Sequence, residues 1–265
     1  MAALAGSDGP VQLRVVGCHG GETPKHRTCA FLLDERLAID AGSLTSGLDL
    51  PLQCKLEAVL VSHSHLDHVR DLATIADNRA QIGCPPLQVV GTKATLDVLR
   101  RHFFNDLLWP DFTCIPSKKE PTIVYRTLKP ETRVVIAGFG VRAVPVTHTI
   151  DTSAFIVDKD GAAVAYSGDT GPTDRLWHAL AEEKDLRALL MEVSFPNELQ
   201  RLATLSGHHT PQTLLKDLKK YHRPKDLPTL LYHIKPAFQA EVEKQCAKLK
   251  GVELTVLSLG EQILL

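Results

Sequence analysis

The sequence predicts a single α/β domain in which sheets lie inside and helices lie outside. The 265 residues suit one large domain, residues 1–265, better than two independent domains. Short apolar runs rich in β-branched residues dominate the chain, and helical segments come between or after them. A doubly wound Rossmann-like domain is the alternative. It is disfavoured because no GxGxxG segment stands at a strand-to-helix junction.

The first half of the chain contains strand-like runs that end in turn or polar residues. Residues 1–10 are small and polar, and we expect them to be disordered or loosely attached. The run VQLRVVG ends at a glycine, FLLDERLAIDAG turns at Asp34 and Glu35, and LEAVLVSH changes abruptly from apolar to polar. Thr92 is placed to cap the helix that follows LQVVG. Strands are therefore expected over 11–17, 30–33, 36–40, 56–63 and 87–91, and helices over 67–77 and 93–104.

The second half begins with an irregular connection, residues 105–121, which contains Pro110, Pro116 and Pro121. Loops this long in a compact domain often carry function. Later runs again look like strands, and VAYSGD ends in an acidic residue. Strands are expected over 122–127, 132–137, 140–146, 153–158, 164–169, 186–193 and 227–233, and helices over 172–183, 210–220 and 236–249. The chain closes with VELTVL and a short apolar end.

Composition limits the partners and the compartment. The 30 basic residues nearly balance the 31 acidic ones, which fits a small anionic substrate better than a long nucleic acid. The six cysteines form no CxxC pair, and scattered cysteines of this kind are typical of free thiols in a reducing compartment. We see no signal peptide, and no apolar run approaches the ~18 residues of a membrane span. A cytoplasmic protein without a membrane partner is therefore expected.

The segment VSHSHLDH concentrates four metal-ligating side chains, those of His63, His65, Asp67 and His68. Because side chains alternate along a strand, His63 and His65 share one face if the extended conformation continues into the loop. Asp67 and His68 then turn back as the helix begins. Imidazole and carboxylate groups suit zinc, manganese or iron at a hydrolytic site. A polar loop of solvated histidines is the alternative, and the tight spacing disfavours it.

Ligand-type residues also follow three later strand-like runs. His148 follows VRAVPVT, Asp169 follows VAYSG, and His233 follows LPTLLY. Taken singly, each residue suits a capping or surface role better than a metal site. Four side chains from one loop cannot complete two metal sites, however, so the set favours one shared centre with the VSHSHLDH segment.

HSHLDH resembles the HxHxDH signature of the metallo-β-lactamase fold superfamily, and the order of the later ligands extends the resemblance over residues 63 to 233. The resemblance implies an αββα sandwich and a hydrolase with two divalent metal ions. Zinc is favoured, with manganese or iron as alternatives. By position in the family, His63, His65 and His148 would bind one ion. Asp67, His68 and His233 would bind the second ion, and Asp169 would bridge the two.

Three further segments, YSGDT, MEVSFPN and SGHHT, resemble class II 3′,5′-cyclic nucleotide phosphodiesterases, and ribonuclease Z enzymes have a related arrangement. By that resemblance His208 protonates the leaving oxygen, and Glu192 orients His208. Two histidines follow Gly207 where the family has one, so His208 and His209 both remain candidates for the proton donor. A capping role for His208 at the helix over 210–220 is the structural alternative.

The segments VGCHGG and RRHFFNDLLWPDF resemble the opening and the insertion of the same phosphodiesterases. The sequence lacks the glycine- and proline-rich arm with which ribonuclease Z enzymes grip tRNA, which favours a small cyclic nucleotide. Phe103, Phe104 and Trp109 are candidate platforms for a purine, although each aromatic residue taken singly suits the core better. The predicted substrate contacts are Asn105, Trp109, Asn197, His209 and Thr210, and the predicted supports behind the site are Glu192 and Asp40.

The hypothesis is a two-metal phosphodiesterase that converts cyclic AMP or cyclic GMP into 5′-monophosphates, with Asp67 and His208 as catalytic residues. The alternatives are a ribonuclease Z-like tRNA 3′-end endonuclease, or a hydrolase of lactones, thioesters or aryl sulfates, which would not need His208 as an acid. A non-catalytic metal-binding scaffold is disfavoured because all seven expected ligands are present. The resemblance suggests a homodimer and leaves the oligomeric state open.

Overall fold

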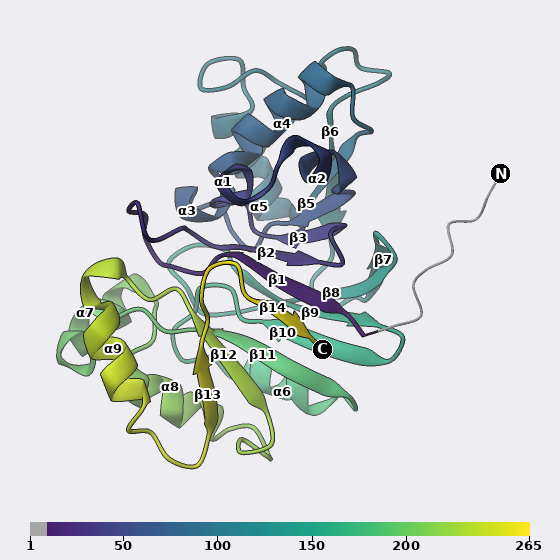
Figure 1. Cartoon of the computed structure of the whole chain (residues 1–265). Coiled ribbons are helices and arrows are strands. Elements are labelled where there is room, and N and C mark those ends of the chain that lie inside the picture. The colour runs from purple at the N-terminus through teal and green to yellow at the C-terminus, as the bar shows by residue number, and fades with distance from the viewer. Residues whose placement is uncertain (1–9) are drawn as a thin grey trace.

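The computed structural model describes residues 10–265, and it places two sheets face to face with helices on both outer sides (Figure 1). This αββα arrangement confirms the fold class that the sequence predicts. The expectation of a loosely attached start concerns residues 1–9, which lie outside the described residues, and Pro10, which is exposed. Among the described residues, no helix combines the length and the apolar character needed to cross a bilayer.

Each sheet contains seven strands within residues 10–265. The first sheet has the order β14 (Gln262–Leu264), β1 (Gln12–Gly17), β2 (Ala30–Leu33), β3 (Leu37–Ile39), β4 (Ala58–Leu60), β5 (Leu87–Thr92) and β6 (Ile123–Leu128). Pairing is antiparallel from β14 to β3 and parallel from β3 to β6. The parallel strands therefore bring the carboxyl ends of β3, β4 and β5 to one edge.

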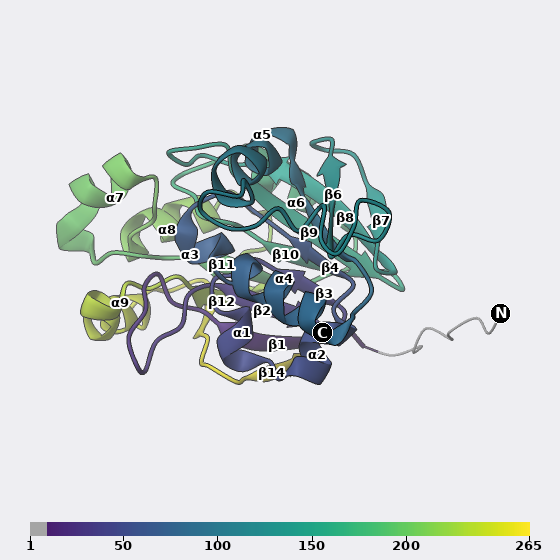
Figure 2. The same cartoon turned by 90° about the horizontal axis from the view of Figure 1, so that it is seen from above.

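The second sheet repeats this scheme. Its order is β13 (Glu253–Val256), β12 (Pro228–Tyr232), β11 (Leu186–Glu192), β10 (Ala162–Tyr166), β9 (Ser153–Lys159), β8 (Phe139–Pro145) and β7 (Val134–Ile136). Pairing is antiparallel from β7 to β10 and parallel from β10 to β13. The last strand of the chain, β14, returns to the first sheet beside β1, as the view from above also shows (Figure 2).

Helices cover the outer face of each sheet (Figures 1 and 2). Those on the first sheet are α1 (Leu44–Gly47), α2 (Leu50–Lys55), α3 (Leu66–Val69), α4 (Asp71–Ile82) and α5 (Lys93–Val98), and those on the second are α6 (Arg175–Ala181), α7 (Gln200–Ser206), α8 (Pro211–Leu218) and α9 (Gln239–Cys246). The predicted helix over 67–77 is divided at Arg70 into α3 and α4. The predicted helix over 93–104 continues from α5 into a π-helical turn at Leu99–Phe103.

Three short helices, α1, α2 and α7, were not predicted. Helices of four to seven residues are too short to show a 3.6-residue hydrophobic period. Local signals do mark their ends: the Asp49 carboxylate accepts the Leu52 N–H at the start of α2, and Gly207 ends α7 with a φ of +68°. Gly207 also lies beside the functional site described below, because its carbonyl contacts His148.

The strands are apolar on both faces because each sheet is buried on both sides. In β2, Phe31 and Leu33 face the opposite sheet, whereas Ala30 and Leu32 pack under the helices of the first sheet. The rings of Phe31 and Tyr232 meet at 5.4 Å between the sheets. This shared core fixes the two sheets against one another, and so it fixes the relative positions of their strand ends.

The expectation that all six cysteines are free thiols is wrong for one pair. Cys54, in α2, forms a disulfide with Cys84, which follows α4, across a Cα–Cα distance of 5.4 Å. Spacing along the chain could not reveal the pair, because the two residues are separated by 30 positions and only the packing of α2 on α4 brings them together. The other cysteines, Cys18, Cys29, Cys114 and Cys246, are free.

Candidate metal centre

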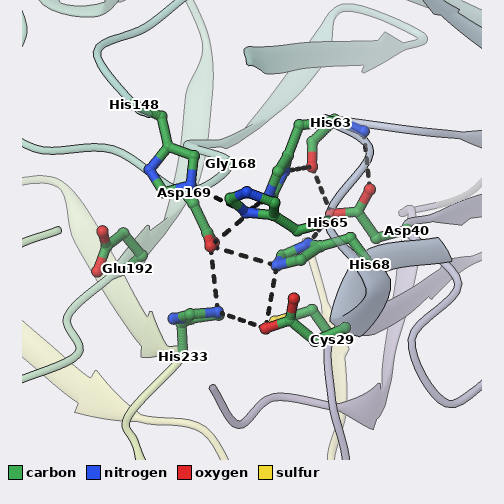
Figure 3. A network of polar contacts seen from close by, with 12 residues as sticks. Cys29, Asp40, His63, His65, His68, His148, Gly168, Asp169, Glu192 and His233 are labelled. Atoms are coloured by element: carbon green, nitrogen blue, oxygen red, sulfur yellow. Dashed lines mark hydrogen bonds and ion pairs between the residues drawn. The ribbon is translucent and has the colours of Figure 1, made fainter. Parts of the chain in front are cut away.

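The predicted ligands meet at the edge where the parallel strands of both sheets end (Figure 3). His63 lies beyond the end of β4, and the first turn of α3 carries Asp67 and His68. Asp169 follows β10, and His233 directly follows β12. Polar side chains converge here because buried parallel strands leave their carboxyl ends open at one edge of a sheet.

One half of the cluster contains three imidazoles and one carboxylate. The Nε2 atom of His63 lies 3.1 Å from the Nδ1 atom of His65, and the Nε2 atom of His148 lies 3.2 Å from the same Nδ1 atom. His63 Nε2 also lies 3.8 Å from the Asp169 carboxylate. The ligand atoms of all four residues lie within 4.8 Å of one another, which is compatible with a single metal ion between them.

The other half of the cluster surrounds the same Asp169 carboxylate oxygen, Oδ2. The Nε2 atoms of His68 and His233 lie 3.3 Å and 3.2 Å from it. Asp67 Oδ2 lies 3.4 Å from His233 Nε2 and 3.9 Å from His68 Nε2. Asp169 thus stands between two groups of ligand atoms, and its carboxylate faces both groups (Figure 3).

Hydrogen bonds behind the rings fix which nitrogen faces the centre. His68 donates from Nδ1 to Asp40 at 2.7 Å, and His148 donates from Nδ1 to the Gly207 carbonyl at 2.9 Å. The Nδ1 atom of His233 lies 2.8 Å from the hydroxyl of Ser194. In each ring Nε2 is then the nitrogen directed into the cluster, as expected of histidines that bind metal.

Asp40 supports the site from the end of β3. Its carboxylate accepts hydrogen bonds from His68, from the backbone and hydroxyl of Ser62, and from the hydroxyl of Tyr166. Asp40 adopts a φ of +57° and His233 a φ of +67°, a region that is uncommon for residues other than glycine. Position 207 favours glycine, because a Cβ there would lie 2.9 Å from Nδ1 of His148.

Burial and charge act in opposite directions at these ionisable groups. Burial, together with the neighbouring His68, lowers the pKa of His63 well below its usual value. Burial alone would also lower the pKa of His68, but the charges of Asp169 and Asp40 outweigh it and raise that pKa well above the usual range. Burial alone would raise the pKa of Asp169, and the surrounding histidines instead hold it far below normal. The centre thus keeps a buried carboxylate charged, which requires positive charge close by.

Several ligand atoms of the cluster, here called orphaned atoms, are buried without a hydrogen-bond partner in the described part of the chain, and a cation between them would pair them. Within residues 10–265, the Nε2 atoms of His68 and His233 and the Oδ1 atom of Asp169 are buried without a hydrogen-bond partner. Buried polar groups are normally paired, because leaving them unpaired costs roughly 1–3 kcal/mol each. Imidazole nitrogens and carboxylate oxygens are ligands for zinc and related divalent metals. The donor set and its orphaned atoms therefore suit divalent metal ions.

His208 and Glu192 stand together beside the cluster. His208 lies 2.9 Å, from its Nδ1 atom, from the Glu192 carboxylate, and its ring stacks on that of His233 with centroids 5.1 Å apart. Burial, followed by the charge of Asp169, raises the pKa of Glu192 to about 8, while burial lowers the pKa of His208. A proton shared by this pair is therefore retained at neutral pH.

His209 and Thr210 are buried and make contacts within α8. His209 is fully buried, with Nδ1 3.2 Å from the hydroxyl of Thr213 and Nε2 3.7 Å from Asp217. Thr210 is also fully buried, and its hydroxyl caps α8 by accepting the Thr213 N–H. Both side chains are therefore engaged within their own segment, and their role as substrate contacts stays a prediction. The structure favours His208 over His209 as the histidine that faces the centre.

The other predicted substrate residues make local contacts. The Asn105 side chain accepts the N–H groups of Leu107 and Leu108, and the Trp109 indole donates to the Ala73 carbonyl in α4. The Asn197 side chain accepts the Gln212 N–H. Phe103 and Phe104, the other candidate platforms, are buried in the core under the first sheet. The substrate role of Asn105, Trp109 and Asn197 stays a prediction.

Sequence reasoning missed three residues behind the centre. Ser194 bonds to His233 and Glu192, Tyr166 bonds to Asp40, and the Cys29 sulfur lies close to the ring nitrogens of His68 and His233. Ser194 stands in the quoted segment MEVSFPN, and its position between Glu192 and His233 was the available signal. Tyr166 and Cys29 sit in apolar strand-like runs, where nothing local distinguishes them from core residues.

Comparisons with known proteins agree with this geometry. The family model for the beta-lactamase superfamily domain matches residues 41–234. A probable 3′,5′-cyclic-nucleotide phosphodiesterase of Yersinia pestis is 32% identical over 69% of this chain and 58% of its own length. A 3′,5′-cyclic-nucleotide phosphodiesterase of Aliivibrio fischeri is 29% identical over 79% of this chain and 68% of its own length. The match therefore spans less than two thirds of the Yersinia relative.

Solved structures share the fold. Unliganded yeast PDE1 superposes with a TM-score of 0.83 at 19% identity, over 97% of this chain and 100% of that one. The short form of human tRNase Z superposes with a TM-score of 0.70 at 16% identity, over 95% of this chain and 98% of that one. The matched family segment, residues 41–234, includes every predicted metal ligand from His63 to His233. The chain belongs to the beta-lactamase superfamily.

Proposed function

We propose that this protein is a two-metal phosphodiesterase that hydrolyses 3′,5′-cyclic nucleotides to 5′-monophosphates. The observation that carries the proposal is the pairing of His208 with Glu192, 2.9 Å apart, at the edge of a cluster of orphaned ligand atoms. Lactone or thioester hydrolysis does not need a proton donor in this position. The names of the similar proteins from Yersinia pestis and Aliivibrio fischeri support the substrate class.

The proposed ligands divide into two sets that share one carboxylate. His63, His65 and His148 would hold one ion, and Asp67, His68 and His233 would hold the other. Asp169 would contact both, since its carboxylate lies within 3.8 Å of His63 and within 3.3 Å of His68 and His233. Two divalent ions, with zinc favoured, would lower the pKa of the attacking water and stabilise the charge that develops on the phosphate.

The chain supplies the proton transfers. Asp67 keeps 30% of its side chain exposed, so its carboxylate can hold or accept the proton of the attacking water. His208 would donate a proton from Nε2 to the leaving ribose oxygen, because its Nδ1 atom is paired with the Glu192 carboxyl group and Nε2 is left for the substrate. The near balance of acidic and basic residues fits a small anionic substrate rather than a long polyanion.

The first experiment is turnover of cyclic AMP, cyclic GMP and bis-p-nitrophenyl phosphate by the metal-loaded protein, with Asp67→Ala as a control. Metal-dependent release of 5′-monophosphate that disappears in Asp67→Ala is the expected result. Cleavage of the chromogenic diester alone would keep the two-metal chemistry and exclude cyclic nucleotides as substrates. It would then favour RNA 3′ ends, the substrates of ribonuclease Z enzymes. No cleavage of any diester by the fully loaded protein would refute the proposal.

His208→Ala tests the assigned acid more sharply. We expect turnover of cyclic nucleotide to fall by about 10²–10⁴-fold while metal content is unchanged. The loss should be much smaller with bis-p-nitrophenyl phosphate, because p-nitrophenolate leaves without protonation. His222→Ala removes an exposed histidine and serves as the matched control. Equal losses on both substrates would show that His208 does not act as the proton donor.

A further inference from the structure

A cysteine, Cys29, lies at the metal centre beside His68 and His233 (Figure 3). Cys29 immediately precedes β2, and its side chain is fully buried. Its sulfur and the ligating nitrogens of His68 and His233 all lie within 4.8 Å of one another. That spacing is compatible with three donors to one ion, since each donor in such a site lies about 2.0–2.3 Å from the metal.

We infer that Cys29 is a sulfur ligand of the metal ion held by His68 and His233. On binding, the S–H bond breaks, the proton passes to solvent, and a metal–sulfur bond forms. The two halves of the centre would then differ in chemistry. The ion near His65 and His148 would have only nitrogen and oxygen donors, whereas the ion near His233 would also have a thiolate.

Two observations besides proximity point to this ion. First, the Nε2 atoms of His68 and His233 are buried without a hydrogen-bond partner among the described residues, so both are free to share one ion with the sulfur. Second, within residues 10–265 the Cys29 thiol makes only a weak hydrogen bond that would compete with metal binding. Its sulfur lies 3.8 Å from the His19 carbonyl, the long distance of a weak sulfur donor. A cation is therefore the stronger partner available to the sulfur.

The surrounding charges explain why a thiolate here needs a metal. Burial, followed by the charges of Asp169, Asp40 and Asp67, raises the pKa of Cys29 well above its usual value. An additional negative sulfur among three carboxylates would be unfavourable in a buried site unless a divalent cation offset it. A thiolate is a soft ligand, so this half of the centre should select zinc over manganese or magnesium.

The inference rests on the two-metal centre proposed above, and it is tested by spectroscopy rather than by turnover. The protein is loaded with two equivalents of Co²⁺, and its near-ultraviolet spectrum is recorded for a thiolate-to-cobalt charge-transfer band. X-ray absorption at the zinc edge of the zinc-loaded wild-type protein is a second measurement. It detects sulfur bound to zinc as a shell at about 2.3 Å. That measurement does not depend on the folding of any variant.

Cys29→Ser is compared with Cys18→Ser, which changes another buried free cysteine whose sulfur contacts the Leu257 carbonyl. We expect the band and the sulfur shell in the wild type and in Cys18→Ser, and neither in Cys29→Ser. Replacement of Cys29 should also reduce the preference for zinc over manganese at one site by about tenfold or more, as changes around metal ligands commonly do.

Three results would overturn the inference. They are two bound cobalt ions without a charge-transfer band, a band that persists in Cys29→Ser, or a protein that binds no cobalt at all. The outcomes also separate the two proposals. A protein that shows the band but does not cleave diesters retains the sulfur ligand and loses the proposed function. A protein that cleaves cyclic nucleotides but shows no sulfur signal supports the proposed function and contradicts Cys29 as a metal ligand.

Discussion

Two adjacent histidines after Gly207 have opposite environments. The ring of His208 packs against those of His148 and His233, at 5.1 Å from each, whereas His209 is enclosed between Thr213 and Asp217. Residue type could not distinguish them, because both are histidines in the same segment. The difference arises because α8 begins just after them and turns the second ring toward its own side chains.

The buried His209 should make stability depend on pH. Burial lowers its pKa from 6.5 to about 4, although Asp217 opposes the shift. Between these values the unfolded chain binds a proton that the folded chain does not, so the stabilising contribution is complete above pH 6.5 and declines as pH falls toward 4. The loss amounts to about 3 kcal/mol. Denaturant unfolding at pH 7 and pH 5 should capture about 2 kcal/mol of this loss, because pH 5 lies only part of the way to the pKa of the folded state.

His209→Gln is the matched comparison, since glutamine does not titrate. The free energy of unfolding of this variant should depend less steeply on pH. The difference in slope corresponds to the uptake of up to one proton on unfolding. Identical slopes for the variant and the wild type would show that His209 is protonated equally in the folded and unfolded states. The metal ligands titrate in both proteins and therefore cancel in the difference.

At the scale of elements, the site depends on where strands stop and how the next helix starts. His63 lies beyond β4, and α3 begins at Leu66, so the HSHLDH segment leaves the sheet and reverses within a few residues. Behind it, α4 packs against α2, and the Cys54–Cys84 disulfide joins α2 to the end of α4. This cross-link stabilises the helical layer that supports α3.

Reduction of this disulfide should lower the free energy of unfolding. Closing a loop across 30 residues lowers the entropy of the unfolded chain, which stabilises the fold by about 3.6 kcal/mol in the chain-entropy treatment. Unfolding of the wild type should therefore shift to lower denaturant concentration when reductant is added. Cys54→Ser should behave like the reduced wild type and be insensitive to reductant. Titration of six free thiols in the unreduced, unfolded protein would contradict the prediction.

At the scale of the whole molecule, the centre joins two halves with the same strand-pairing scheme. The first sheet and its helices supply His63, His65, Asp67 and His68, and the second supplies His148, Asp169 and His233. Neither half holds the complete ligand set. The core between the sheets, where Phe31 packs against Tyr166 and Tyr232, brings the halves together.

Removal of metal should therefore destabilise the fold as well as abolish turnover. Ions that bind only the folded chain stabilise it by about 3 kcal/mol at a free concentration of 100 times the dissociation constant. Thermal unfolding with and without chelator should show a lower midpoint after metal removal. Asp169→Asn, which weakens both proposed sites, should respond less to the chelator. An unchanged midpoint in wild type with verified loss of both ions would contradict the shared-site assignment.

The sequence alone determined the fold class, and it marked the positions of the candidate metal ligands. Buried strands read as continuous apolar runs, and a polar ligand after such a run is visible without coordinates, as for His63 in VSHSHLDH or Asp169 in VAYSGD. The HxHxDH pattern adds specificity, because few local structures place imidazoles and a carboxylate so close together. These features are local, so the linear sequence retains them.

Only the tertiary structure decided which neighbours act together. It turned His208 toward the centre and His209 away from it, it paired Cys54 with Cys84, and it placed Cys29 beside the ligands His68 and His233. Cys29 and His233 are separated by most of the chain, and their approach depends on two sheets packing at one angle and register. Distances of this kind follow from the packing of the whole core, and no local pattern of residues encodes them.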